Sequence, residues 1–209
     1  AQGHTTTVIY LHAETQALLK RFSETRRKHP LSHGQLTLPE AIEEESGLLA
    51  PVRIGADLTI DTTSLNIHEL NLLLRQRIEV RPSDHSLSLL IQSFGFKHGI
   101  PLDSDFMFDM RCLPNPYWEP RLRQFTGLDA PIVEYLEQFP DVQRMYESLE
   151  RFMEEWTPAF SSCNRSYVTV SIGCTGGRHR SVYMVEKLGN HLKEILGDSV
   201  KIRHRNVKS

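Results

Sequence analysis

Apolar runs alternate with amphipathic stretches along the chain, and this pattern predicts an α/β protein. Short apolar or alternating runs predict strands at residues 7–11, 56–61, 87–96, 106–110, 167–172 and 200–205. Apolar positions spaced three and four residues apart predict helices at residues 15–28, 66–77, 141–157 and 181–196. We therefore expect the later part of the chain to form a mixed sheet flanked by helices.

Residues at the predicted helix ends support this pattern. Asn66 is followed three residues later by Glu69, which is a capping arrangement for the start of a helix. The first predicted helix ends in Arg26, Arg27 and Lys28, where cations complement the helix dipole. Both helices are therefore expected to begin or end at these residues.

A polar stretch at residues 81–86 separates two predicted units. It contains Pro82 and carries no apolar periodicity, as is usual for a boundary between domains. We expect one unit at residues 1–80, a linker at 81–86 and a second unit at 87–209.

The composition is that of an ordinary globular protein. Of the 209 residues, 39% are hydrophobic and 24% are charged, and no apolar run reaches the roughly 18 residues that a membrane helix needs. The three cysteines form no C-x-x-C pair and the ten histidines form no H-x-x-x-H pair. These features predict a cytoplasmic chain without a membrane contact or a metal site.

Charge is distributed unevenly along the chain. The total is close to neutral, with 24 Lys and Arg against 26 Asp and Glu. Residues 163–209, however, contain nine basic and three acidic residues, which leaves an excess of six positive charges. This excess indicates an anionic partner, although a solvated charged face produces the same pattern.

The glycine-rich stretch at residues 173–181 is the main candidate site. It lies between a predicted strand and a predicted helix, where free backbone amides and the helix dipole favour an anion. The expected phosphate-binding residues are Thr175, Gly176, Gly177, Arg180 and Ser181. Lys97 and His98, which follow another strand, are candidates to complete the site from the side, although each taken singly is more typical of a surface residue. The alternative is a glycine-rich turn whose arginines face water.

Cys174, Arg180 and Ser181 permit a second interpretation. The pattern C-x-x-G-x-x-R-S resembles the phosphate loop of cysteine-dependent phosphatases, in which a thiolate attacks phosphorus. Gly173 stands where those enzymes have a histidine, and no aspartate is placed as a general acid. We favour a buried, unreactive Cys174 over a nucleophile.

The basic tail is a second candidate site. In an extended strand, Lys201, Arg203 and Arg205 would point to one side and form a line of cations suited to a phosphate backbone. A charged edge that discourages strand pairing would use the same residues.

Several segments together resemble the RapZ (YvcJ-like) family, which comprises nucleotide-binding P-loop proteins and includes an RNase adapter. The segments that carry the resemblance, which extends from about residue 8 to the end, are residues 93–101, 109–111, 113–116, 126–129, 164–167 and 172–181.

The resemblance divides the chain into a partial and a complete domain. The first 80 residues resemble the back half of a P-loop kinase-like domain, and the sequence contains no G-x-x-x-x-G-K-[ST] loop. The chain therefore looks truncated. ATP and GTP are bound in the intact family, but no nucleotide cofactor and no nucleotide hydrolysis are expected from this chain.

For the second unit, the resemblance implies binding of a phosphorylated amino sugar, such as glucosamine-6-phosphate, and of small RNA. The implied sugar-phosphate residues are Thr175, Gly176 and Arg180, together with the segment of Asn115 and Tyr117. Tyr117 stands where the adapter has a histidine, and it cannot carry a positive charge.

The resemblance also implies RNA contacts and protein partners. The implied RNA-binding residues are Lys97, His98, Arg178, Arg203, Arg205 and Lys208. An endoribonuclease partner and a homo-oligomer are expected by the same resemblance. A protein-interaction module that uses the acidic helix at residues 141–157 is a further alternative.

Overall fold

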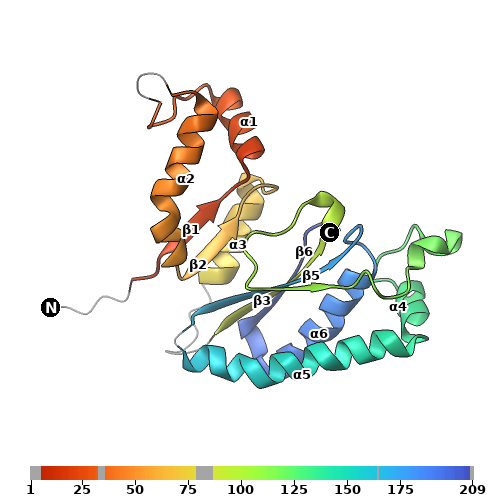
Figure 1. Ribbon diagram of the computed structural model, residues 1–209. Coiled ribbons are helices and arrows are strands. Elements are labelled where there is room, and N and C mark those ends of the chain that lie inside the picture. Colours follow the sequence, from red (N-terminus) through yellow and green to blue (C-terminus); the bar gives the residue numbers. More distant parts are fainter. Residues whose placement is uncertain (1–5, 33–35, 79–86, 164, 208–209) are drawn as a thin grey trace. The chain divides into compact units, whose positions relative to one another are not determined.

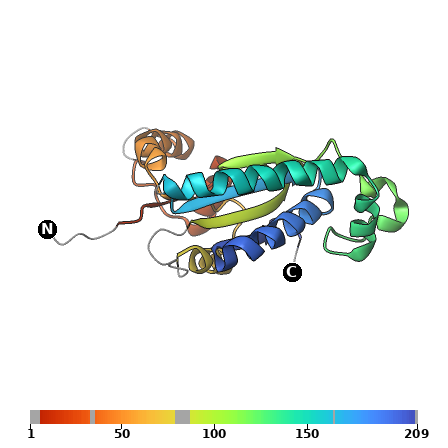
Figure 2. The same ribbon diagram turned by 90° about the horizontal axis from the view of Figure 1, so that it is seen from below.

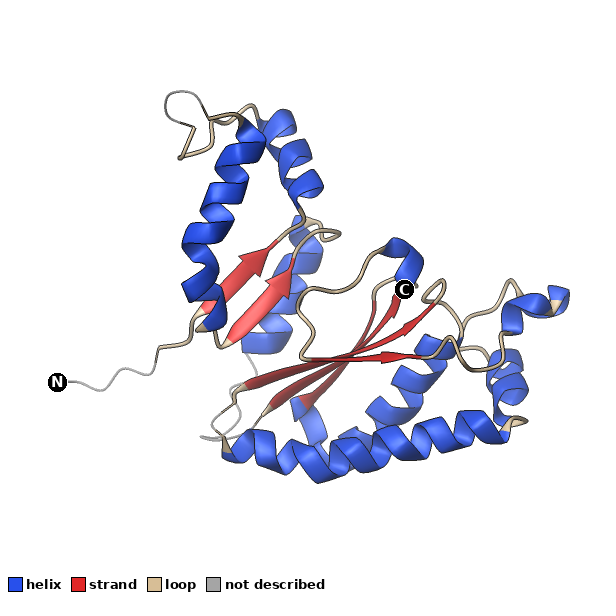
Figure 3. Ribbon diagram, viewed as in Figure 1, coloured by secondary structure: helices blue, strands red, loops and turns tan. Residues whose placement is uncertain are grey.

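The computed structural model describes residues 6–32, 36–78, 87–163 and 165–207 (Figure 1). The chain divides into two compact units, residues 1–75 and 76–209. Each unit contains both helices and strands, as the colouring by secondary structure shows (Figure 3). The predicted α/β class is therefore confirmed. The linker predicted at residues 81–86 lies outside the described residues.

The first unit contains a pair of parallel strands. Strand β1 (Ile9–His12) pairs with β2 (Leu58–Asp61), and the register places Ile9 opposite Leu58 and His12 opposite Asp61. The helices of this part of the chain are α1 (Thr15–Thr25), α2 (Leu38–Ile54) and α3 (Ile67–Ile78).

The helix ends confirm one sequence expectation and correct another. At the start of α3, Asn66 Oδ1 accepts the backbone amides of His68 and Glu69, and Glu69 Oε2 accepts that of Asn66 at 2.8 Å. Helix α1 ends earlier than predicted, because Arg26 adopts a left-handed conformation with φ of 52°. Arg26, Arg27 and Lys28 therefore follow the helix instead of forming its last turn.

The second unit is built on a four-stranded sheet in the order β4-β5-β3-β6. Its elements are β3 (Ser88–Gly95), η1 (Phe96–His98), β4 (Phe106–Asp109), η2 (Pro116–Trp118), η3 (Pro120–Leu122), α4 (Ala130–Glu137), α5 (Pro140–Ser162), β5 (Tyr167–Cys174), α6 (Arg180–Leu196), η4 (Gly197–Ser199) and β6 (Val200–His204).

All described pairings in this sheet are parallel, so the prediction of a mixed sheet is wrong. Because the strands run in the same direction, each connection between successive strands has to return the chain to the opposite edge of the sheet, as helix α6 does between β5 and β6. Strand β6 lies at one edge of this sheet, since among the described residues it pairs with β3 alone. As a result, all four strands have their carboxyl ends at the same edge of the sheet.

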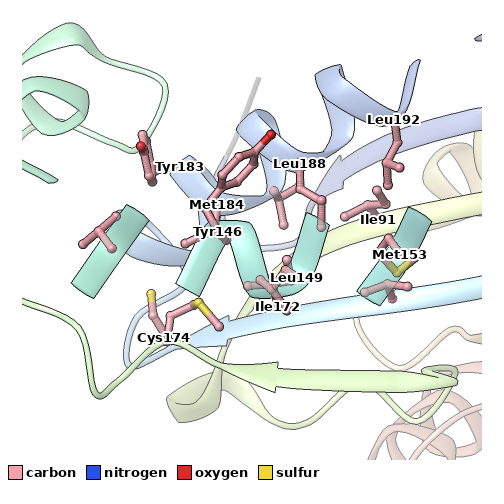
Figure 4. Packing of buried hydrophobic residues seen from close by; sticks show 14 of the residues in the cluster. Ile91, Tyr146, Leu149, Met153, Ile172, Cys174, Tyr183, Met184, Leu188 and Leu192 are labelled. Atoms are coloured by element: carbon pink, nitrogen blue, oxygen red, sulfur yellow. The ribbon is translucent and has the colours of Figure 1, made fainter. Parts of the chain in front are cut away.

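The hydrophobic core lies between this sheet and helices α5 and α6, which run along one face of it (Figure 2). Ile91 and Ile172 from the central strands meet Met153 from α5 and Leu188 from α6 (Figure 4). All four side chains are fully buried. Burial of such side chains stabilises the fold by about 1.5–3 kcal/mol each, so the core holds the strand ends in place.

The described residues contain no helix that is both long enough and apolar enough to cross a membrane.

Candidate anion-binding site

The glycine-rich loop lies at the carboxyl end of β5, where ligands of open α/β sheets usually bind. Strand β5 extends to Cys174, two residues beyond its predicted end, and α6 begins at Arg180. Residues 175–179 therefore form a short connection between a central strand and a helix of 17 residues. Backbone amides at the start of α6 supply a partial positive charge at this position.

Glycines allow this loop to lie directly against the end of β3. A Cβ atom on Gly95 would come within 2.5 Å of the Gly176 carbonyl carbon and 2.7 Å of the Gly177 amide nitrogen. Gly177 also has a φ of 67°, a conformation that side chains disfavour. The residue types at positions 95 and 177 thus determine the shape of the loop.

Lys97 approaches the same loop from η1. Its backbone amide donates a hydrogen bond to the Thr175 carbonyl at 3.2 Å. Its ammonium group lies near Gly176, 3.7 Å from the position that a Cβ atom would take there. Lys97, His98 and Thr175 are exposed. The structure therefore brings Lys97 to the loop as the sequence predicts.

Arg180 is the buried cation of the site, with only 4% of its surface exposed. Its Nη1 donates to the carbonyl oxygens of Arg111 at 3.1 Å and Leu113 at 2.9 Å, and its Nη2 donates to Thr175 Oγ1 at 3.4 Å. Its Nε has no hydrogen-bond partner among the described residues. A buried guanidinium whose hydrogen bonds go to neutral oxygen atoms favours an anion nearby.

The Asp109 carboxylate is already paired with Arg111, and its pKa also responds to the charge of Arg180. Asp109 at the end of β4 forms an ion pair with Arg111 at 2.7 Å. Hydrogen bonds from Arg111, followed by smaller contributions that include the charge of Arg180, hold the pKa of Asp109 below its usual value. The Arg111 guanidinium in turn lies over the Phe96 ring at 3.9 Å.

Cys174 and Ser181 face each other beneath the loop. Their Sγ and Oγ atoms are 3.2 Å apart, and both residues are almost fully buried. Burial raises the pKa of the Cys174 thiol, but hydrogen bonds from Ser181 and Gly177 and the charge of Arg180 lower it overall. The Ser181 hydroxyl is thus engaged with the thiol. Cys174 belongs to the hydrophobic core, so the burial that we favoured is confirmed, whereas its lack of reactivity stays a prediction.

The two remaining loop residues, Arg178 and His179, form hydrogen bonds with the neighbouring segment at residues 125–127. Arg178 is exposed, while its carbonyl oxygen accepts the Gly127 amide at 2.7 Å. His179 is buried and its Nε2 lies 2.9 Å from the Phe125 carbonyl oxygen. Burial lowers the pKa of His179, so the imidazole is neutral at pH 7. Arg178 is therefore the exposed cation of the loop itself.

Asn115 and Tyr117 lie on the segment that Arg180 holds through Leu113. Asn115 Oδ1 accepts the Tyr117 amide at 3.4 Å and so caps η2. The Tyr117 ring, which is 55% exposed, lies beneath the Arg123 guanidinium at 5.0 Å. The described ring contact of Tyr117 is thus with Arg123 and not with the glycine-rich loop.

The basic tail is less exposed than a line of free cations would be. Arg205 forms an ion pair with buried Asp103 at 3.7 Å, and its side chain is 11% exposed. Arg203 is half-buried. Lys208 lies outside the described residues. Of the predicted RNA-binding residues that the structure describes, Lys97, His98 and Arg178 are the exposed ones.

Sequence reasoning assigned no role to Asn206. Its Oδ1 accepts the Gly95 amide at 2.8 Å and contacts Gly177. The carbonyl groups of Arg111 and Leu113 are likewise unassigned by the sequence pattern. These contacts join segments far apart in the chain, so local periodicity contains no sign of them.

The fold and the loop define an α/β protein with a candidate site for an anion at the ends of parallel strands. The chain matches two protein families, the RapZ-like N-terminal domain over residues 1–81 and the RapZ C-terminal domain over residues 87–208. This chain belongs to the RapZ family.

Three relatives illustrate the similarity, and each has the name nucleotide-binding protein. That of Thioalkalivibrio sulfidiphilus is 54% identical over 99% of this chain and 72% of its own length. That of Alkalilimnicola ehrlichii is 53% identical over 99% of this chain and 71% of its own length. That of Azotobacter vinelandii is 50% identical over 96% of this chain and 70% of its own length. These comparisons do not support a cysteine-dependent phosphatase.

The described residues of the first unit do not fit the triphosphate of ATP or GTP. A P-loop needs glycines between a strand and a helix, together with a lysine and a hydroxyl residue. The glycines described in this unit are Gly47, inside α2, and Gly55, at its end. Neither of them follows a strand, so we derive no nucleotide chemistry from these residues.

Proposed function

We propose that the second unit binds a phosphorylated amino sugar of the glucosamine-6-phosphate type at residues 175–180. Small RNA binds to the exposed cations beside this loop. The protein then acts as an RNase adapter-like regulator that senses the sugar phosphate and presents RNA to an endoribonuclease. It works as a homo-oligomer in the cytoplasm, and this chain has no enzymatic activity of its own.

The observation that carries the proposal is the buried guanidinium of Arg180. Its hydrogen bonds end on two carbonyl oxygens and one hydroxyl, so its charge has no direct carboxylate partner among the described contacts. A phosphate that hydrogen-bonds to such a cation gains about 1.5–3 kcal/mol per charged hydrogen bond. Lys97 adds a flexible cation at the rim of the same loop.

RNA recognition is supported by the exposed basic side chains on η1 and on the loop. Lys97 and His98 lie on η1, and Arg178 lies on the loop itself. Phosphates of a single strand that bind here would displace counterions, with a salt slope of about 0.7 for each phosphate neutralised. Because Lys97 would serve both ligands, the sugar phosphate weakens RNA binding, and RNA weakens sugar-phosphate binding by the same factor.

A competition titration tests this function. The affinity of a fluorescently labelled RNA hairpin with a single-stranded tail is measured by anisotropy, with and without saturating glucosamine-6-phosphate. We expect the sugar phosphate to weaken RNA binding and the substitution Lys97→Ala to lower the salt slope by about 0.7. Arg151→Ala removes an exposed cation from α5 and should leave both quantities unchanged. Equal RNA affinity with and without the sugar phosphate would contradict the proposal.

A further inference from the structure

Asn206, two residues beyond the end of β6, touches both the glycine-rich loop at residues 175–179 and the end of β3. Its Oδ1 accepts the Gly95 amide at 2.8 Å. The same oxygen lies 2.5 Å from the position that a Cβ atom would take on Gly177. The Asn206 side chain thus fills the space beside Gly177, the loop residue that has a positive φ.

The segment that carries Asn206 is fixed to β3. Where the pairing of β6 with β3 ends, the Arg205 amide donates to the Ser93 carbonyl at 3.0 Å. The His204 Nδ1 atom lies 2.8 Å from Ser93 Oγ, and its Nε2 lies 2.9 Å from Glu186 Oε1 on α6. Asn206 is therefore held in register with the strand whose end the loop contacts.

Three segments meet at this point. Gly95 ends β3, Gly177 lies in the loop after β5, and Asn206 follows β6. Gly95 and Gly177 are both buried, and a Cβ atom on either one would collide with backbone atoms of the other segment. Buried backbone cannot move aside as a side chain can, so the loop and the end of β3 are packed tightly against each other. Asn206 fills the space beside this contact, and its displacement would therefore change the position of the loop.

We propose that Asn206 is a positioning residue that holds the phosphate loop in its anion-binding shape and couples it to the C-terminal segment. This inference rests on the proposed binding of a phosphate at residues 175–180. It makes the loop depend on the C-terminal segment: a change in the position of Asn206 weakens the loop for the phosphate.

The test compares Asn206→Ala with the wild type by calorimetry, using inorganic phosphate and glucosamine-6-phosphate as probes. Loss of one hydrogen bond to the Gly95 amide is expected to weaken binding roughly two- to tenfold. Amide exchange measured by NMR should accelerate at Gly95. The matched control is Asn190→Ala, which removes an exposed asparagine from α6 and should change neither quantity.

Asn206→Asp separates the hydrogen bond from the charge. A carboxylate still accepts the Gly95 amide, so exchange at Gly95 should stay slow. Its negative charge lies beside the loop, so phosphate binding should weaken, and the difference from the wild type should shrink as salt is added.

The decisive readout combines phosphate affinity with amide exchange at Gly95. Asn206→Ala should bind phosphate more weakly and exchange the Gly95 amide faster, whereas Asn190→Ala should match the wild type in both. An unchanged phosphate affinity or unchanged exchange at Gly95 in Asn206→Ala would overturn the inference while the proposed function stands. A wild type that binds neither phosphate probe would instead contradict the proposed function, and the inference would fall with it.

Discussion

Replacing Gly177 with alanine should disrupt the loop, whereas the same change at neighbouring Gly176 should not. A Cβ atom on Gly177 would meet the Asn206 Oδ1 at 2.5 Å, the Gly95 amide nitrogen at 2.6 Å and the Phe94 carbonyl carbon at 2.8 Å. A Cβ atom on Gly176 would meet only the Lys97 side chain, at 3.6 Å and beyond. The two substitutions add the same methyl group one residue apart.

The magnitude follows from the geometry of each position. The left-handed backbone of Gly177 costs an alanine about 1–2 kcal/mol, and the collision with buried backbone costs about 1–3 kcal/mol. Alanine also restricts the unfolded chain more than glycine does, and this stabilises the folded state by about 0.4–1 kcal/mol. We therefore expect Gly177→Ala to lose about 2–4 kcal/mol of unfolding free energy and Gly176→Ala to change it by less than about 1 kcal/mol.

Urea denaturation followed by tryptophan fluorescence measures this difference. The two tryptophans, Trp118 and Trp156, both belong to the second unit, so the signal reports on the unit that contains the loop. With a typical urea dependence of about 1–3 kcal/mol per molar, the midpoint of Gly177→Ala should fall by about 1 M or more. Equal midpoints for the two variants would refute the account of how the loop packs against β3.

Three further predictions concern other parts of the second unit. Burial lowers the pKa of His179, so the unfolded state binds a proton more readily, and unfolding free energy should fall as the pH drops below about 6.5; His179→Gln should flatten this change, and an identical pH profile would contradict it. Cys112 and Cys163 are exposed and Cys174 is buried, so a thiol reagent should titrate two thiols in the native protein and the third only in denaturant; three fast thiols would show that Cys174 is accessible. Leu188 is fully buried between α6 and the sheet, so Leu188→Ala should cost about 2–5 kcal/mol in the same urea assay, and a loss below about 1 kcal/mol would place it outside the core.

Most of the fold could be predicted from the sequence because its periodicity is strong. Helix α5 spans residues 140–162 with apolar positions such as Val142, Leu149 and Met153 turned to the core, and its central part was predicted. Helix α2 was missed, although Thr37 and Glu40 form a capping box at its start. The apolar residues of α2 follow the helical period only weakly, because much of the helix is exposed and the apolar Leu48 and Ile54 face solvent.

Strand direction was harder to predict than strand position. A run of apolar residues is the same in a parallel and an antiparallel sheet, so the sequence of β3 or β5 does not reveal its neighbours' direction. The crossover helices do contain that information. Helix α6 fills the interval between β5 and β6 and makes a parallel arrangement the expected one.

The candidate site was predicted in outline and not in its internal contacts. The order of strand, glycine-rich loop and helix predicted the position of Thr175 and Arg180. The pairing of Arg205 with Asp103 and the contact of Asn206 with Gly95 join residues about a hundred positions apart. Such contacts depend on the sheet order, which only the folded structure supplies.

Calorimetric titration with glucosamine-6-phosphate tests the central claim most directly, with glucosamine and inorganic phosphate as the ligand controls. The wild type should bind the sugar phosphate and inorganic phosphate but not glucosamine, which lacks the phosphate. Arg180→Lys keeps the charge and loses the forked hydrogen bonds, so binding should weaken by about tenfold or more, whereas Arg151→Ala should bind normally. Binding that is absent in the wild type, or equally strong in Arg180→Lys, would contradict the account.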